Sequence, residues 1–129
     1  MVSRPLLFLL FLSAMLHLWD LSEPDSVVFD EVHFGKFVTA YCCSGERFFD
    51  IHPPHGKLLI AGVAKLGGYQ GDFGFDTIGQ PYGHTLIFSL RLVPAISGIL
   101  LPLILYGLLI RLGASRAAAW FGALLITLD

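Results

Sequence analysis

Two adjacent carboxylic acids, Asp30 and Glu31, are the residues of this sequence best suited to acid–base chemistry. A carboxylate held beside a hydroxyl group can act as its general base. The pair precedes an apolar pattern with helical spacing, so Asp30 could instead cap that helix and Glu31 could favour its dipole. Neighbouring helical side chains point about 100° apart. One acid can therefore face a substrate while the other holds the chain in place, and the local pattern leaves both interpretations open.

The second candidate site is a rigid turn, His-Pro-Pro-His-Gly-Lys, at residues 52–57. Proline fixes the backbone there, and a helix predicted over residues 56–66 would offer its N-terminus to an anion. Arg91 begins a long apolar stretch, and its planar fork of donors can hold two phosphate oxygens. His52, Lys57 and Arg91 are therefore candidate substrate-binding residues. The alternatives are a turn with a solvated lysine, and an arginine that anchors a helix at the membrane surface.

The two cysteines point to no metal site. Cys42 and Cys43 are adjacent, which is not a zinc-binding spacing. A bond between direct neighbours strains the disulfide geometry, so we expect two small apolar residues of a helix. A net charge of −2 also offers no basic surface for nucleic acid.

The candidate residues lie in a polar segment between apolar ones. Of the 129 residues 55% are hydrophobic and only 14% are charged, whereas soluble domains carry about 25% charged residues. Of the ten acidic residues, all except Asp129 lie between Asp20 and Arg91. Uncharged apolar runs around a polar segment are typical of membrane spans around an extramembrane loop. We therefore predict an all-α integral membrane protein.

Three membrane spans and one external loop are predicted. The spans cover residues 5–19, 91–110 and 117–129, and the loop covers residues 20–90. The third span is truncated and would continue in a longer parent protein. The first run is also short, so a cleaved signal peptide is the alternative, but no small-x-small site follows it. Arg4, Arg111 and Arg116 mark the cytoplasmic side, which makes the loop external or lumenal.

The loop is expected to fold, because it carries two amphipathic helices suited to the membrane interface. Gly45 would end the first helix, and glycines would end the second. Their apolar faces comprise Val32, Phe34, Phe37, Val38 and Tyr41 in the first, and Leu59, Ile60, Val63 and Leu66 in the second. The glycine-rich residues 67–83 would then form an irregular but ordered loop.

Five blocks occur in order along the sequence, namely Phe29–Lys36, Phe48–Leu59, Gly79–Gly83, Arg91–Ala95 and Arg111–Arg116. Together they resemble the first external loop and the following spans of the protein O-mannosyltransferase family. The Asp-Glu and His-Pro-Pro-x-Gly-Lys motifs are too specific together for coincidence, and the resemblance covers about residues 16–129. It departs at His55, where the family usually has an apolar or small residue, and in length, because these enzymes have many more spans.

The resemblance implies a membrane glycosyltransferase of the GT-C type. Such enzymes transfer mannose from a polyprenyl or dolichyl phosphate to Ser or Thr hydroxyls of proteins, with inversion of the anomeric centre. In the family the Asp lies at the reaction centre, so Asp30 is assigned as general base and Glu31 as a supporting acid. Arg91, His52 and Lys57 are expected to bind substrate. No resident cofactor is firmly implied, although a divalent metal is compatible with the reaction.

Two alternatives are a related GT-C enzyme with a lipid or glycan acceptor, and a non-catalytic truncated membrane subunit. A chain with three spans is too small to hold a polyprenyl donor, so we expect it to be inactive alone and its longer parent to be the enzyme. The expected partners are the lipid-linked donor, a Ser/Thr acceptor protein, the lipid bilayer and a family member in a dimer. The compact loop and the lack of a leader extension favour a bacterial plasma membrane, with the endoplasmic reticulum membrane second.

Overall fold

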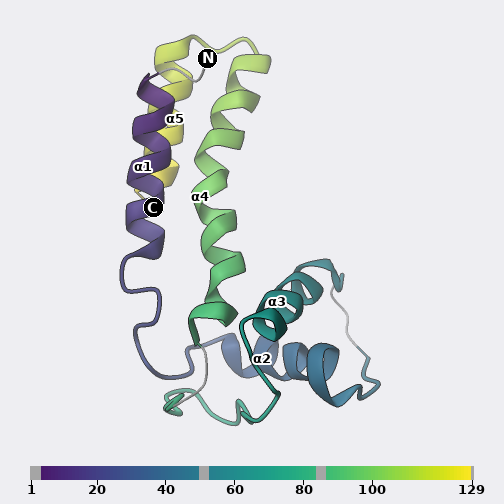
Figure 1. The fold of residues 1–129 in the computed structure, drawn as a ribbon. Helices are drawn as coiled ribbons and strands as arrows, with labels where there is room; N and C mark the ends of the chain where they lie inside the picture. The colour runs from purple at the N-terminus through teal and green to yellow at the C-terminus, as the bar shows by residue number, and fades with distance from the viewer. Residues whose placement is uncertain (1–3, 50–52, 84–86, 129) are drawn as a thin grey trace. The chain divides into compact units, whose positions relative to one another are not determined.

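The computed structural model describes residues 4–49, 53–83 and 87–128, which are mainly helical (Figure 1). The elements are α1 (Arg4–Leu18), α2 (Glu31–Thr39), the π-helix η1 (Ala40–Ser44), α3 (His55–Leu66), α4 (Ile87–Arg111) and α5 (Arg116–Thr127). These described residues contain no β-strand, only an isolated antiparallel bridge between Ser26 and Pro81. The predicted all-α class is therefore confirmed for this part of the chain. Two residues named above, His52 and Asp129, lie outside it.

The chain divides into two compact units, which are described separately. Unit 1 comprises Met1–Trp19 and Pro94–Asp129, and unit 2 comprises Asp20–Val93. Unit 1 therefore contains α1, α5 and most of α4, whereas unit 2 contains α2, η1, α3 and the first two turns of α4. The limits of unit 2 lie within a few residues of the loop predicted over residues 20–90.

Among the described helices, only α4 is both long and apolar enough to cross a membrane. Its 25 residues extend about 37 Å, more than the roughly 30 Å of a hydrocarbon core. Its bounds include Ile87, four residues before the predicted start at Arg91, and Ile87 and Leu90 are buried in the core of unit 2. The helices α1 and α5 are apolar but have only 15 and 12 residues. Spans at these two positions stay predictions.

Within unit 1, α1 and α5 pack side by side (Figure 1). Leu9 of α1 and the small Ala119 and Ala123 of α5 are fully buried, and small side chains let two helices approach closely. The indole Nε1 of Trp120 donates a hydrogen bond to the carbonyl oxygen of Pro5 at 3.2 Å. This bond fixes the start of α1 against the first turns of α5.

A short turn joins α4 to α5 as the sequence indicates. Gly113 has a φ of 90°, which reverses the chain after α4 and which a residue with a Cβ rarely adopts. The hydroxyl of Ser115 accepts a hydrogen bond from the N–H of Ala118 at 3.2 Å and so caps α5. Arg111 and Arg116 are consequently the last residue of α4 and the first residue of α5.

The helix α2 begins at Glu31, but Asp30 does not cap it. Asp30 occupies the N-cap position with helical torsions, φ −75° and ψ −13°, and its carboxylate makes no cap hydrogen bond. An N-cap side chain reaches the amides of the first turn from an extended backbone, so the capping prediction is wrong for Asp30. At the other end, Gly45 has a φ of 66° and ends η1, as predicted.

The helix α3 lies within one residue of its predicted range, but only part of its predicted apolar face is buried. Lys57, Ala61 and Ala64 are buried in unit 2, whereas the side chains of Leu59 and Leu66 are 49% and 90% exposed. Leu59 and Leu66 thus point away from the core of unit 2, whereas Ile60 is partly buried against it. Their contact with a membrane interface stays a prediction.

The core of unit 2 is built around aromatic residues from its glycine-rich segment, among them Tyr69, Phe75 and Tyr82. Phe75 lies directly over Gly35 of α2, where any Cβ would collide with the ring. Contrary to expectation, Cys42 and Cys43 form a disulfide with an S–S distance of 2.00 Å. They lie in the π-helical turn of η1, a local geometry that the sequence pattern did not predict.

Candidate functional site

Glu31 is the centre of a polar cluster in unit 2. Its Oε1 accepts a hydrogen bond from Arg91 Nε at 2.7 Å, and its Oε2 accepts one from Arg91 Nη2 at 3.1 Å. The same Oε2 accepts from the hydroxyl of Tyr82 at 3.0 Å and from the backbone N–H of Val28 at 2.8 Å. Both carboxylate oxygens are therefore occupied, and this pairing of arginine and carboxylate is the bidentate kind.

The Arg91 guanidinium has no spare donor in this arrangement. Besides its bonds to Glu31, Nη1 donates to the carbonyl oxygens of Leu21 at 3.3 Å and Pro24 at 3.2 Å. Its Nη2 also donates to the carbonyl oxygen of Ser26 at 3.1 Å. Arginine has five N–H donors, and all five are matched by these acceptors. Arg91 therefore ties α4 to the start of α2 and to the chain that leads into it.

Tyr82 also belongs to the cluster, although its position in the Gly79–Gly83 motif did not predict a site residue. Its side chain is 3% exposed, its ring stacks on Phe73 at a centroid distance of 4.8 Å, and the Arg91 guanidinium lies 5.8 Å from its centroid. Burial and the neighbouring Glu31 carboxylate raise the pKa of Tyr82, so its hydroxyl stays a donor. The Gly-Gln-Pro-Tyr-Gly motif marks Tyr82 in the sequence. The sequence does not show that the Tyr82 hydroxyl bonds to Glu31, which lies 51 residues away.

The electrostatics of the cluster keep Glu31 ionised. Burial acts to raise the pKa of its carboxyl group, but the hydrogen bonds from Arg91, Val28 and Tyr82 and the charge of Arg91 together lower it below the ordinary value. A carboxylate of low pKa whose oxygens are already occupied is a poor proton acceptor. Glu31 is thus suited to holding the loop rather than to acid–base work.

Asp30 has the opposite surroundings. Its backbone carbonyl accepts from the N–H groups of His33 and Phe34 at 3.0 and 2.9 Å, which starts the helix. Its side chain is exposed and makes no cap hydrogen bond. The two adjacent acids therefore point to different surroundings, one into the Arg91 cluster and one to solvent. An exposed carboxylate on a fixed helix start can approach a hydroxyl group of a bound substrate.

The structure does not bring every candidate into this cluster. Lys57 of α3 is only 3% exposed, and its Nζ lies 4.1 Å from the ring centroid of Phe37 and 5.5 Å from that of Phe34. It therefore makes cation–π contacts with α2. His52 lies outside the described residues. Within the described part of the chain, no group of three or more His, Cys, Asp or Glu residues could hold a metal ion.

A mainly helical chain with one apolar helix of membrane-spanning length defines a class, the integral membrane proteins. The particular family follows from comparison. The family model described as dolichyl-phosphate-mannose-protein mannosyltransferase matches residues 7–129. The chain belongs to this family.

Individual relatives agree. The chain is 44% identical to protein O-mannosyltransferase 1 of Drosophila melanogaster over 86% of its length and 12% of that relative. It is 48% identical to dolichyl-phosphate-mannose–protein mannosyltransferase 1 of Saccharomyces cerevisiae, over 73% of the chain and 12% of that relative. It is 38% identical to protein O-mannosyl-transferase 1 of Mus musculus, over 99% of the chain and 17% of that relative.

A solved structure is also similar. It is the S. cerevisiae protein O-mannosyltransferase Pmt1-Pmt2 complex bound to the sugar donor, with a TM-score of 0.89 and 40% identity over 98% of this chain and 18% of that chain. The chain thus spans between 12% and 18% of the proteins that it resembles here. Because these relatives are from fly, yeast and mouse, the preference for a bacterial plasma membrane finds no support.

Proposed function

We propose that this chain contributes the Asp-Glu site to a mannosyltransferase that takes mannose from dolichyl phosphate and transfers it to Ser or Thr hydroxyls of proteins. The observation that carries the proposal is the separation of the two acids, Glu31 bound in a cluster and Asp30 exposed, in a chain of this family. We assign the activity to a longer parent protein, because the chain spans only 12–18% of the proteins that it resembles.

The proposed reaction is a single inverting displacement. The acceptor hydroxyl oxygen forms a bond to the anomeric carbon of mannose while the bond from that carbon to the phosphate oxygen breaks. Asp30 takes the hydroxyl proton, and dolichyl phosphate leaves with the electron pair. A positioned base of this kind typically contributes about 10²–10⁴-fold to the rate. Glu31 stays ionised throughout and keeps the start of α2 in place.

The roles proposed for the cations differ from one another. Arg91 was expected to bind the donor phosphate, but its donors are taken up by Glu31 and by three backbone carbonyls, which supports a positioning role. His52, which precedes α3, and Lys57, in the first turn of α3, stay proposed substrate-binding residues. The kinetics of variants separate these roles, because loss of a phosphate ligand raises the KM for the donor without a loss of stability.

The remaining proposals concern the membrane in which the protein lies and its protein partner. We place the three predicted spans in the endoplasmic reticulum membrane, with unit 2 on the lumenal side, since the similar proteins are eukaryotic. Pairing with a second family member is supported by the similar complex of two such proteins.

The test is an assay of the parent protein with labelled dolichyl-phosphate mannose and a Ser/Thr peptide. Label on the peptide, and none when the chain of 129 residues is used alone, is the expected result. Label on a lipid or glycan acceptor but not on the peptide would favour the related GT-C reaction. No transfer to any acceptor would favour the non-catalytic subunit.

A further inference from the structure

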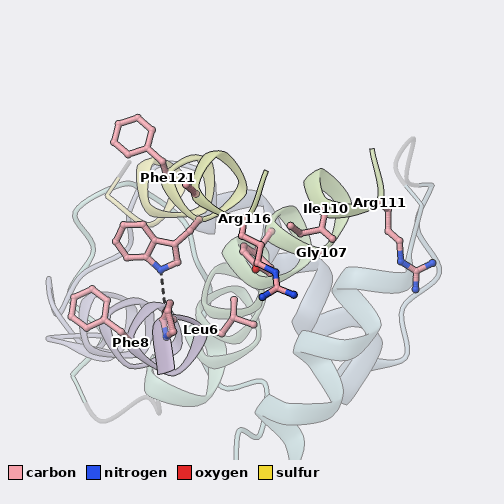
Figure 2. Close-up of a pocket in the computed structure, with 11 residues that line it drawn as sticks. Leu6, Phe8, Gly107, Ile110, Arg111, Arg116 and Phe121 are labelled. Atoms are coloured by element: carbon pink, nitrogen blue, oxygen red, sulfur yellow. Dashed lines mark hydrogen bonds between the residues drawn. The ribbon is translucent and has the colours of Figure 1, made fainter. Parts of the chain in front are cut away.

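Unit 1 contains an open hollow of about 1180 Å³ that the proposed reaction does not use. It lies between the first turns of α1, the last turns of α4 and the first turns of α5 (Figure 2). Pockets for drug-sized ligands measure about 300–1,000 Å³, so this hollow has room for a larger amphiphile. The residues that matter for its chemistry are Leu6, Phe8, Ile110, Arg111, Arg116 and Trp120.

The apolar wall of the hollow is held in place by the protein itself. The hydrogen bond from Trp120 to the carbonyl oxygen of Pro5 fixes the indole ring, whose centroid lies 6.4 Å from that of Phe8. Gly107 of α4 also lines the hollow, and nothing lies within 4 Å of the place that its Cβ would occupy. The wall therefore offers a preformed aromatic and aliphatic surface with space beside α4.

Two guanidinium groups border this apolar wall. Figure 2 shows Arg116 reaching into the hollow between Leu6 and Ile110, while Arg111 points away from it at the rim. The described residues of unit 1, which are 4–19 and 94–128, include no Asp or Glu. Neither arginine can therefore pair with a carboxylate from these residues. A cation above an apolar surface is complementary to an amphiphile with an anionic group.

We propose that this hollow binds an anionic glycerophospholipid. Its headgroup phosphate would lie on Arg116, and an acyl chain would follow Leu6, Ile110 and Trp120. Arginine binds phosphate through two parallel N–H donors. The predicted topology assigns both arginines to the cytoplasmic side, where the leaflet is rich in anionic lipids and basic pockets between helices bind their headgroups. A free phosphate ion would leave the aromatic wall uncovered, whereas a lipid would contact both Arg116 and that wall.

The charge test uses the whole chain in phosphatidylcholine nanodiscs that contain phosphatidylserine. Native mass spectrometry counts the phosphatidylserine molecules that stay bound after the protein is released from the nanodiscs. Arg116→Gln should lower the retained phosphatidylserine about fivefold, the usual effect of one arginine near an anionic surface. Arg4→Gln is the matched control, because it removes the same charge from the start of α1 at a residue that does not line the hollow. An equal loss in Arg4→Gln would show that phosphatidylserine is held by non-specific charge attraction and would overturn the proposal.

The shape test changes no charge. Gly107→Leu fills the hollow from α4 and should lower retention as much as Arg116→Gln, whereas unchanged retention in a folded variant overturns the proposal. Millimolar inorganic phosphate should displace no phosphatidylserine, and displacement would mean a phosphate site instead. In the parent protein, a benzophenone amino acid at Phe121 should crosslink to lipid. A crosslink to polypeptide would show that protein fills the hollow and would also overturn the proposal.

Discussion

The two units of this protein use arginine in opposite ways. In unit 2, Arg91 donates all five N–H groups to one carboxylate and three backbone carbonyls. In unit 1, Arg111 and Arg116 border an open hollow, and the described residues of that unit supply no carboxylate. The same side chain thus holds the fold together in one unit and is available to a ligand in the other. The difference is set by which acceptors surround it and not by residue type.

The acids of unit 2 show the same contrast within two adjacent residues. Glu31 accepts four hydrogen bonds, whereas the exposed Asp30 side chain makes no cap bond. We expect bound charges to determine stability and exposed charges to act on ligands. The following experiments test that expectation and the close packing of unit 2 on which it depends.

The largest effect is expected from Asp30→Asn in the parent protein. Mannosyl transfer should fall about 10²–10⁴-fold, because an amide cannot take the hydroxyl proton. The melting temperature should hardly change, since the carboxylate caps nothing. Steady-state kinetics and thermal unfolding check both parts, with the exposed Asp72→Asn as control. Near-normal turnover in Asp30→Asn together with a dead Glu31→Gln would exchange the two roles.

Arg91→Ala should act mainly on stability. It leaves the partly buried Glu31 without its bidentate partner, which should cost about 3 kcal/mol of unfolding free energy, at the lower end for buried pairs because the Glu31 side chain is 21% exposed. Arg91→Lys should recover part of this loss, since lysine keeps the charge but not the fork. Thermal unfolding in detergent measures the stability of both variants. A normal melting temperature with a raised KM for the donor would instead support the phosphate-binding role.

A glycine pair tests whether unit 2 is packed closely enough to hold the cluster. Gly35→Ala would place a methyl group in the ring of Phe75 and should destabilise the unit by about 1–3 kcal/mol. Gly62→Ala in α3 meets open space and should stabilise it by roughly 0.5–1 kcal/mol. Both are measured by chemical unfolding. Equal effects of the two substitutions would contradict close packing at α2.

The smallest effect is expected from Tyr82→Phe, which removes one hydrogen bond to Glu31 and should cost about 1 kcal/mol near pH 7. The folded pKa of Glu31 lies below its ordinary 4.5, so its contribution to stability is present above pH 4.5 and is lost as pH falls through the folded pKa. In Tyr82→Phe the folded pKa should rise towards 4.5, and the loss of stability on acidification should be smaller. Melting temperatures between pH 7 and pH 3 measure this, with Tyr106→Phe as control. Parallel curves for both variants would argue against the Tyr82 bond.

Much of the local structure could be predicted because it depends on neighbouring residues. The range of α3, the end of η1 at Gly45 and the basic turn after α4 follow from apolar spacing, glycine conformation and charge. The Asp-Glu and His-Pro-Pro-x-Gly-Lys motifs also indicated the family before any fold was known. In these cases the interactions that determine the structure join residues that lie close together in the sequence.

Only the tertiary structure decided how the charged residues are used. Arg91 looked like a phosphate ligand, yet its carboxylate partner is 60 residues away in the sequence, and the Tyr82 hydroxyl joins from 51 residues away. The same holds for α3, whose pattern predicted its length but not that Lys57 would face the core while Leu66 is exposed. Periodicity within one helix predicts which residues share a side of that helix. Which side is buried depends on the surfaces that the rest of the folded chain brings against it.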